Sequence, residues 1–157
     1  MTHPAAPSSY VTLGVGEDRF AVEVQIVREI LDDSRPVAFL PNAPSFLRGI
    51  IDVRGCTVPV LDLRVKLGLP AASSTDDTRI LVLDLPVSER HLVIGMQVDR
   101  VFEVAEFATH TLDSAPDIGV RWKSDYIKAI GRLHDNFVVI FDMQHLFSIH
   151  EIASLSV

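Results

Sequence analysis

The side chains in this chain best suited to covalent chemistry are those around Cys56, its only cysteine. A thiolate is a strong nucleophile, but it needs a histidine, a cation or a helix N-terminus beside it to be activated. Arg54 is the only such group nearby in the sequence. The segment 50–64 is otherwise rich in Val, Ile and Leu, which favours a pair of strands over a catalytic loop. We therefore predict that Cys56 is not catalytic.

Three histidines near the C-terminus offer the other possible chemistry, that of a metal site. His134, His145 and His150 do not have the spacing of the compact zinc motifs, and no second cysteine is present to assist them. The nucleophile, phosphate-loop and zinc-helix motifs G-x-S-x-G, G-x-x-x-x-G-K-[ST] and H-E-x-x-H are missing from the sequence. These observations predict a protein that has no metal, no cofactor and no enzymatic activity.

Charge and hydropathy argue against two further classes of protein, those that bind nucleic acid and those that insert into a membrane. The chain has 14 Lys and Arg against 21 Asp and Glu, a formal charge of −7, so it lacks the cationic field that nucleic acid binding requires. Charged residues, Pro or Gly interrupt each apolar run before it reaches membrane-spanning length, and the first ten residues do not resemble a signal peptide. We expect a cytoplasmic protein without nucleic acid partners or direct membrane insertion.

The elements that position these side chains read mostly as short strands. After a tail at residues 1–9 that we expect to be disordered, a two-residue alternation predicts strands at 10–15, 19–24, 36–40, 46–53 and 56–61, with a helix or irregular turn near 24–31. Gly55 suits the tight turn between the last two strands. Asp62 is placed to cap a short helix at 63–68.

The pattern then repeats. Residues 46–67 resemble residues 126–147 without a gap, 80 positions later, and 19–24 resemble 91–96, 72 positions later. Five strand candidates in each copy predict an all-β fold of two small antiparallel barrels that pack together as one domain, 10–157. We assign about 10–70 and 150–157 to the first barrel and about 78–149 to the second, with a linker at 69–78. A C-terminal helix at 142–154, capped by Asp142, should cover a barrel with Leu146, Phe147 and Ile149.

Three motifs carry a family resemblance. V27-R-E-I30, the block 44–64 (P-S-F-L-R-G-I-I-D-V-R-G-C-T-V-P-V-L-D-L-R) and 93–104 (V-I-G-M-Q-V-D-R-V-F-E-V) resemble CheW, the bacterial chemotaxis coupling protein, in content, order and spacing. The resemblance covers nearly the whole chain. It implies two SH3-like five-stranded barrels with a groove between them. It also implies a non-catalytic adaptor that links the signalling tips of chemoreceptors to the regulatory domain of a CheA-type histidine kinase, in arrays at the membrane.

The same resemblance assigns residues to receptor binding: Val27, Glu29, Gly49, Arg54, Gly95, Val101 and Val104. An ion pair with Glu29 would orient Arg54. Asp52 and Val53 replace the Asn and Leu of the family pattern, and Asp52 offers Arg54 a second, local carboxylate. Each glycine has an alternative structural explanation, and each valine can equally belong to the core. The resemblance does not assign the residues that contact the kinase.

Two other functions are consistent with the sequence. One is a CheW-like adaptor in a chemosensory system that controls pili, surface sensing or development. The other is a small-ligand sensor that uses the groove between the barrels, which would require an enclosed apolar cavity with convergent polar groups.

Overall fold

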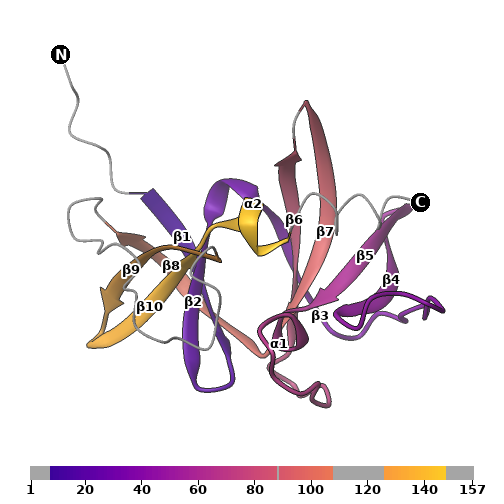
Figure 1. Ribbon diagram of the computed structural model, residues 1–157, viewed down its shortest axis with the longest axis horizontal. Coiled ribbons are helices and arrows are strands. Elements are labelled where there is room, and N and C mark those ends of the chain that lie inside the picture. The colour runs from indigo at the N-terminus through magenta and orange to yellow at the C-terminus, as the bar shows by residue number, and fades with distance from the viewer. Residues whose placement is uncertain (1–7, 88, 108–125, 148–157) are drawn as a thin grey trace.

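A computed structural model describes residues 8–87, 89–107 and 126–147, which form two five-stranded sheets (Figure 1). Along the chain the elements are β1 (Ser8–Val15), β2 (Asp18–Glu23), the 3-10 turn η1 (Val24–Ile26), β3 (Val27–Asp32), β4 (Leu47–Val53), β5 (Cys56–Asp62), α1 (Leu63–Lys66), β6 (Arg79–Val87), β7 (Arg90–Val98), β8 (Arg100–Phe107), β9 (Ile127–Leu133), β10 (Asn136–Phe141) and α2 (Met143–Leu146). The predicted all-β class with two five-stranded, SH3-like units is confirmed.

Each sheet combines strands from both copies of the repeat. The terminal barrel has the order β8-β1-β2-β10-β9, and the middle barrel has the order β3-β6-β7-β5-β4. The first hairpin of each copy thus pairs with the last three strands of the other copy. Our predicted division, which kept the strands of each copy in one barrel, was therefore wrong. The two hairpins have similar apolar patterns, so the sequence does not show which barrel each one joins. The stretch 69–78 forms neither helix nor strand, and it joins two elements of the middle barrel.

The pairing registers define which residues are equivalent. Ile140 pairs with Ala21 in the terminal barrel, and Val60 pairs with Gly95 in the middle barrel. Since Val60 and Ile140 are 80 positions apart, Ala21 corresponds to Gly95, 74 positions later. The predicted shift of 72 between these strands was therefore wrong by two residues, an error that leaves every side chain on its correct face.

The ends of the two copies repeat the same capped turn. Asp62 accepts a hydrogen bond from the amide of Arg64, and Asp142 accepts one from the amide of Gln144, so both predicted caps are confirmed. The helix after Asp142 ends at Leu146, earlier than predicted. Leu146 and Phe147 are fully buried, as expected, whereas Ile149 lies outside the described residues.

The strands alternate between buried and exposed positions, and the buried side chains form three clusters. In β4, Leu47, Gly49, Ile51 and Val53 are buried while the residues between them are not. The largest cluster contains residues of both barrels, including Phe20, Phe141, Leu83 and Met96. The two smaller clusters are each confined to one barrel. Because the largest core is shared, neither barrel can bury its apolar surface alone.

A polar contact fixes the chain where it crosses from the middle to the terminal barrel. Asp99, between β7 and β8, accepts hydrogen bonds from Arg64 at 2.6 Å and from the amide of Gly16 at 2.7 Å. Its own amide donates to the carbonyl of Gly14 at 3.1 Å. Asp99 therefore ties the crossover to the β1–β2 turn of one barrel and to α1 of the other.

The exchange of hairpins predicts that the two copies stay together after the linker is cut. Residues 71–77 are exposed, so a specific protease site inserted between Ala71 and Ala72 should be cleaved without disturbing either sheet. We expect the two fragments to elute together in gel filtration and to separate only in denaturant. Fragments that separate under native conditions would contradict the exchanged pairing.

A second prediction concerns the Asp62 cap. Burial raises the pKa of Asp62 above its ordinary value of 3.8, against the opposing effect of amide hydrogen bonds. The folded protein therefore binds this proton more tightly than the unfolded chain does, and stability falls as pH rises through this pKa. Asp62→Asn keeps the cap without the charge, so its stability should not fall as pH rises through this range. Asp62→Ala removes the cap and should lower the free energy of unfolding by about 1 kcal/mol. Urea unfolding at acidic and neutral pH measures both. An Asn variant as unstable as the Ala variant would contradict this account.

Candidate functional site

The β4–β5 hairpin presents Arg54 at its tip. Arg54 and Gly55 form the two-residue turn with φ of 53° and 85°, the left-handed pair that tight hairpins use. The amide of Gly55 donates to Asp52 Oδ1 at 2.9 Å. The carboxylate of Asp52 therefore stabilises the turn, and the local contact with Arg54 that we considered does not form.

Arg54 pairs instead with Glu29 on β3. Arg54 Nη2 lies 3.0 Å from Glu29 Oε2, which confirms the predicted ion pair. The Arg54 side chain is 80% exposed, against 21% for Glu29. An ion pair at such an exposed position adds little to stability. Its effect is to orient a guanidinium whose remaining N–H donors face solvent.

The pair lies at the rim of a groove of about 1390 Å³ that is partly open to solvent. Its described apolar walls come from the loop after β3 and from β4, β5, β6 and β7: Leu40, Pro41, Ala43, Pro44, Leu47, Ile50, Val53, Val58, Pro59, Val82, Leu92 and Val93. The polar residues at its boundary are Arg28, Glu29, Asn42, Arg54, Cys56 and Thr57. All these residues belong to the middle barrel, whereas the resemblance implied a groove between barrels.

Gly49 and Gly95 shape this barrel without lining the groove. A Cβ on Gly49 would lie 2.4 Å from the carbonyl oxygen of Ala38, and Gly49 has φ of 153°. Ala38 and Ile50 exchange two backbone hydrogen bonds of 2.8 and 2.9 Å at this point, which hold the 36–44 loop against β4. A Cβ on Gly95 would lie 3.0 Å from Ile80 Cγ2. Both glycines therefore allow close packing behind the groove.

The three valines assigned by resemblance lie away from the groove lining. Val27 on β3 and Val101 on β8 are partly buried against the shared core. Val104, also on β8, is 62% exposed and belongs to the terminal barrel. Of the seven assigned residues, the structure brings together only Glu29 and Arg54 at the groove.

Other candidate residues occupy ordinary positions. Cys56 is exposed at the boundary of the groove. His134 pairs with Glu103 and His145 with Asp142, while His150 lies outside the described residues. Among the described residues, no group of three or more His, Cys, Asp or Glu is arranged to hold a metal ion. In the same ranges, no helix has the length and apolar character needed to cross a membrane.

Sequence reasoning missed the loop that forms one wall of the groove. Residues 36–40 were predicted as a strand and 41–45 as a connecting loop, yet only Ala38 forms a bridge to β4. Leu40, Pro41, Ala43 and Pro44 line the groove. The signal that was available is the pair of prolines, which stiffen a loop and favour a fixed wall.

Comparison with known proteins finds one group that matches most of the chain. The profile of the CheW-like domain matches residues 9–151. The chemotaxis protein CheW of Klebsiella aerogenes is 28% identical over 144 residues, which cover 92% of this chain and 84% of that protein. The chemotaxis protein CheW of Bacillus subtilis is 30% identical over 129 residues, covering 82% and 79%.

A solved structure shares the fold. The scaffolding protein TtCheW from Thermoanaerobacter tengcongensis superimposes with a TM-score of 0.81 and covers 96% of this chain and 94% of its own. Its sequence is 23% identical. At this level of identity the similarity establishes the shared fold of two SH3-like units. It does not identify the proteins that this chain binds.

The geometry predicts opposite outcomes for two substitutions on β4 and its turn. Gly49→Ala should lower the free energy of unfolding by about 2 kcal/mol or more, because the new methyl group meets the carbonyl of Ala38. Arg54→Ala should change it by less than about 0.5 kcal/mol, since the side chain is exposed. Urea denaturation of both variants beside wild type tests this. A fully stable Gly49→Ala variant would show that the glycine is not required for packing.

Proposed function

The chain belongs to the family of CheW-like domains, and from this premise we propose that it is a chemotaxis adaptor joining chemoreceptors to a CheA-type histidine kinase. The observation that carries the proposal is the exposed Arg54 guanidinium, oriented by Glu29 at the rim of an apolar groove. We refer to this pair and its rim as the Arg54 corner. The function requires no catalysis, and we propose none.

The Arg54 corner suits a helix from a receptor signalling tip. Such a helix would place apolar side chains against the groove walls, the usual way in which an amphipathic helix binds a groove. A carboxylate on the same helix would accept hydrogen bonds from Arg54, whose planar group favours two parallel contacts. Among the residues assigned by resemblance, Glu29 and Arg54 therefore act directly, while Gly49 and Gly95 act through packing.

The kinase would bind elsewhere, on exposed apolar side chains. Five large apolar residues of the described chain are exposed: Ile30, Phe39, Phe102, Val104 and Phe137. Phe39 in the middle barrel and Phe137 in the terminal barrel are the most exposed of the five, at 79% and 64%, so each barrel can offer a separate small contact to the kinase regulatory domain. Small interfaces suit an assembly whose strength comes from many repeated contacts. Recruitment from the cytoplasm to an array at the membrane follows from binding a receptor.

The alternative functions differ in what they require of the groove. An adaptor of a non-flagellar chemosensory system would use the same contacts, and only its receptors and kinase would differ. A small-ligand sensor needs an enclosed pocket, typically about 300–1,000 Å³. The groove described here is larger, at about 1390 Å³, and partly open. These features favour a macromolecular partner.

Binding measurements with separate receptor and kinase fragments test the proposal. Wild type should bind both a receptor signalling tip and the kinase regulatory domain. Arg54→Ala should weaken receptor binding about tenfold, the effect of losing one charge-assisted contact, and leave kinase binding unchanged. Arg54→Lys should restore only part of the affinity, because the ammonium lacks the planar fork.

Arg90→Ala is the matched control, since Arg90 is an exposed arginine at the β6–β7 hairpin, outside the groove lining. This variant should bind both partners like wild type. A protein that binds neither fragment would contradict the adaptor function. Equal loss of both partners in Arg54→Ala would contradict the role given to the hairpin.

A further inference from the structure

The terminal barrel carries a histidine–carboxylate contact at the position equivalent to Arg54 and Glu29. His134 follows Arg54 by 80 positions, the spacing of the repeated hairpins, and Glu103 follows Glu29 by 74 positions. His134 Nε2 lies 3.1 Å from Glu103 Oε1, compared with 3.0 Å for Arg54 and Glu29. We call this second pair the His134 corner.

The strand registers confirm that β8 is the counterpart of β3. Val101 pairs with Leu13 and Val27 pairs with Leu83, and in each strand the register then shifts at the next residue. This irregularity places Glu103 and Glu29 at the same point of their barrels. The correspondence therefore rests on backbone pairing and does not depend on the identity of the acidic side chains.

The two hairpin tips also share an uncommon backbone conformation. His134 and Asp135 have φ of 50° and 64°, close to the values of 53° and 85° at Arg54 and Gly55. Positive φ is unusual for residues other than glycine, although Asp adopts it more readily than most. The tip that presents Arg54 is thus reproduced in the other barrel with different side chains.

A further polar contact repeats on β4 and β9, at the end of each strand that lies away from the hairpin tip. Arg48 on β4 donates to the side chain of Gln97 at the end of β7, and Lys128 on β9 contacts Glu23 at the end of β2 at 2.6 Å. Lys128 follows Arg48 by 80 positions, and Gln97 follows Glu23 by 74. Two separate polar pairs are therefore related by the same offsets of 80 and 74 positions. This repetition argues against a chance meeting of His134 and Glu103.

The His134 corner is accessible and has apolar neighbours. His134 is 71% exposed and Glu103 48% exposed. Beside Glu103 on β8, Phe102 and Val104 are exposed by 41% and 62%, and Val104 corresponds to Ile30 beside the Arg54 corner. The β9–β10 and β4–β5 hairpins lie at opposite ends of the molecule (Figure 1). The chain therefore presents two similar corners too far apart to serve as one site.

The chemical difference between the corners is protonation. Arginine is cationic at every physiological pH, whereas histidine gains its charge only as pH falls through about 6.5. The protonated ring has two N–H donors, so Nε2 can donate to Glu103 while Nδ1 donates to a partner. Glu103 on β8 contacts His134, and Asp135 and Arg132 are its charged neighbours along the chain. Arg19 and Arg100 lie over the ring of Phe102, beside Glu103, at 4.4 and 5.9 Å. Arg132 lies over the ring of Phe137 at 5.0 Å, and the structure gives it no carboxylate partner among the described residues.

We propose that the His134 corner is a second binding point for a helix that bears a carboxylate beside apolar side chains, and that protonation of His134 strengthens it. This inference rests on the proposed function, because the partner is the class of helix proposed for the Arg54 corner. Charge complementarity supports that partner: the corner has one carboxylate already paired, a histidine that becomes cationic, and the Arg132 cation nearby. Apolar contact would come from Phe102 and Val104.

The test isolates the second corner by removing the first. Arg54→Ala protein labelled with ¹⁵N is titrated with a receptor signalling-tip fragment at about pH 6 and about pH 8, which bracket the histidine range. We expect amide shifts centred on Glu103 and His134, with affinity roughly threefold higher at the lower pH, the size of one exposed charge contact. Adding His134→Ala should remove this pH dependence. Adding His134→Arg should give the tighter binding at both pH values.

His91→Ala in the same background is the matched control. His91 is 70% exposed, pairs with Asp84 at 3.0 Å and lies on the β6–β7 hairpin of the middle barrel, in the other barrel from His134. This substitution should leave the pH dependence unchanged. If His91→Ala removes the effect, or if His134→Ala does not, the proposal is overturned.

The remaining outcomes separate this inference from the proposed function. Wild type that fails to bind the receptor fragment at about pH 8 would overturn the adaptor function itself. Wild type that binds while the Arg54→Ala protein shows no shifts near His134 at about pH 6 would overturn only the second binding point. Shifts at this corner that arise instead with anionic vesicles, or with increasing protein concentration alone, would identify a lipid or a second copy as the occupant and equally overturn it.

Discussion

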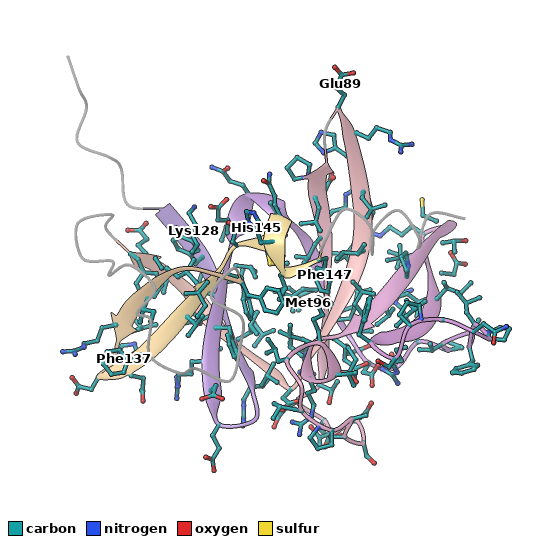
Figure 2. The ribbon with its side chains drawn as sticks, viewed as in Figure 1. Glu89, Met96, Lys128, Phe137, His145 and Phe147 are labelled. Carbon is teal, nitrogen blue, oxygen red and sulfur yellow. The ribbon has the colours of Figure 1, made fainter. Side chains whose placement is uncertain are left out.

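The exchange of hairpins between the two copies is the constraint on which the rest of the structure depends. β1 and β2 complete a sheet made of β8, β9 and β10, while β6 and β7 complete one made of β3, β4 and β5. Each barrel therefore needs residues from both copies, and the chain crosses between barrels at η1 and at Asp99. The sticks in Figure 2 show Met96 and Phe147 near the centre of the molecule, within the core that both barrels share. Such an arrangement resists independent opening of either barrel, and it gives the Arg54 corner a firm base.

The sequence predicted the elements better than their pairing. Strands 46–53 and 56–61, the caps at Asp62 and Asp142, and the repeat itself follow from local pattern, and all are present. β3 was missed because Val24, Val27 and Leu31 have helical spacing, while the alternation within Val27–Asp32 is of half-buried residues and gives a weak signal. The pairing of hairpins was not predictable from one sequence, since it depends on contacts between segments far apart in the chain.

In the candidate site, too, the sequence predicted individual residues but not how distant segments pack together. Glu29 and Arg54 were found through the family motif, and their contact needed only that β3 lie beside the hairpin tip. Pro41 and Pro44 indicate a stiff loop, but the place where it packs could not be foreseen, because that depends on the bridge between Ala38 and Ile50. Gly49 explains that bridge, since no larger residue leaves room for the carbonyl of Ala38. A motif residue can thus shape the groove wall without lining the groove itself.

Comparison of the two copies indicates where the duplicated scaffold has diverged. Buried equivalents remain apolar, as with Val60 and Ile140, because both fill the interior of a barrel. Lys66 differs from its equivalent in this respect. It is half-buried and corresponds to the fully buried Leu146, and its ammonium lies 5.0 Å from the ring of Phe46 and 5.6 Å from that of Tyr126. The aromatic faces attract the cation, so a charged side chain is tolerated at this half-buried position.

Exposed equivalents are under no such packing constraint. Arg54 and His134 stand on nearly the same backbone, so the two hairpin tips differ chiefly in their side chains. An arginine at one tip and a histidine at the other are both largely exposed, so they can differ without disturbing a packed core. Duplication followed by exchange of hairpins gives this chain two geometrically matched corners whose chemistry can vary independently.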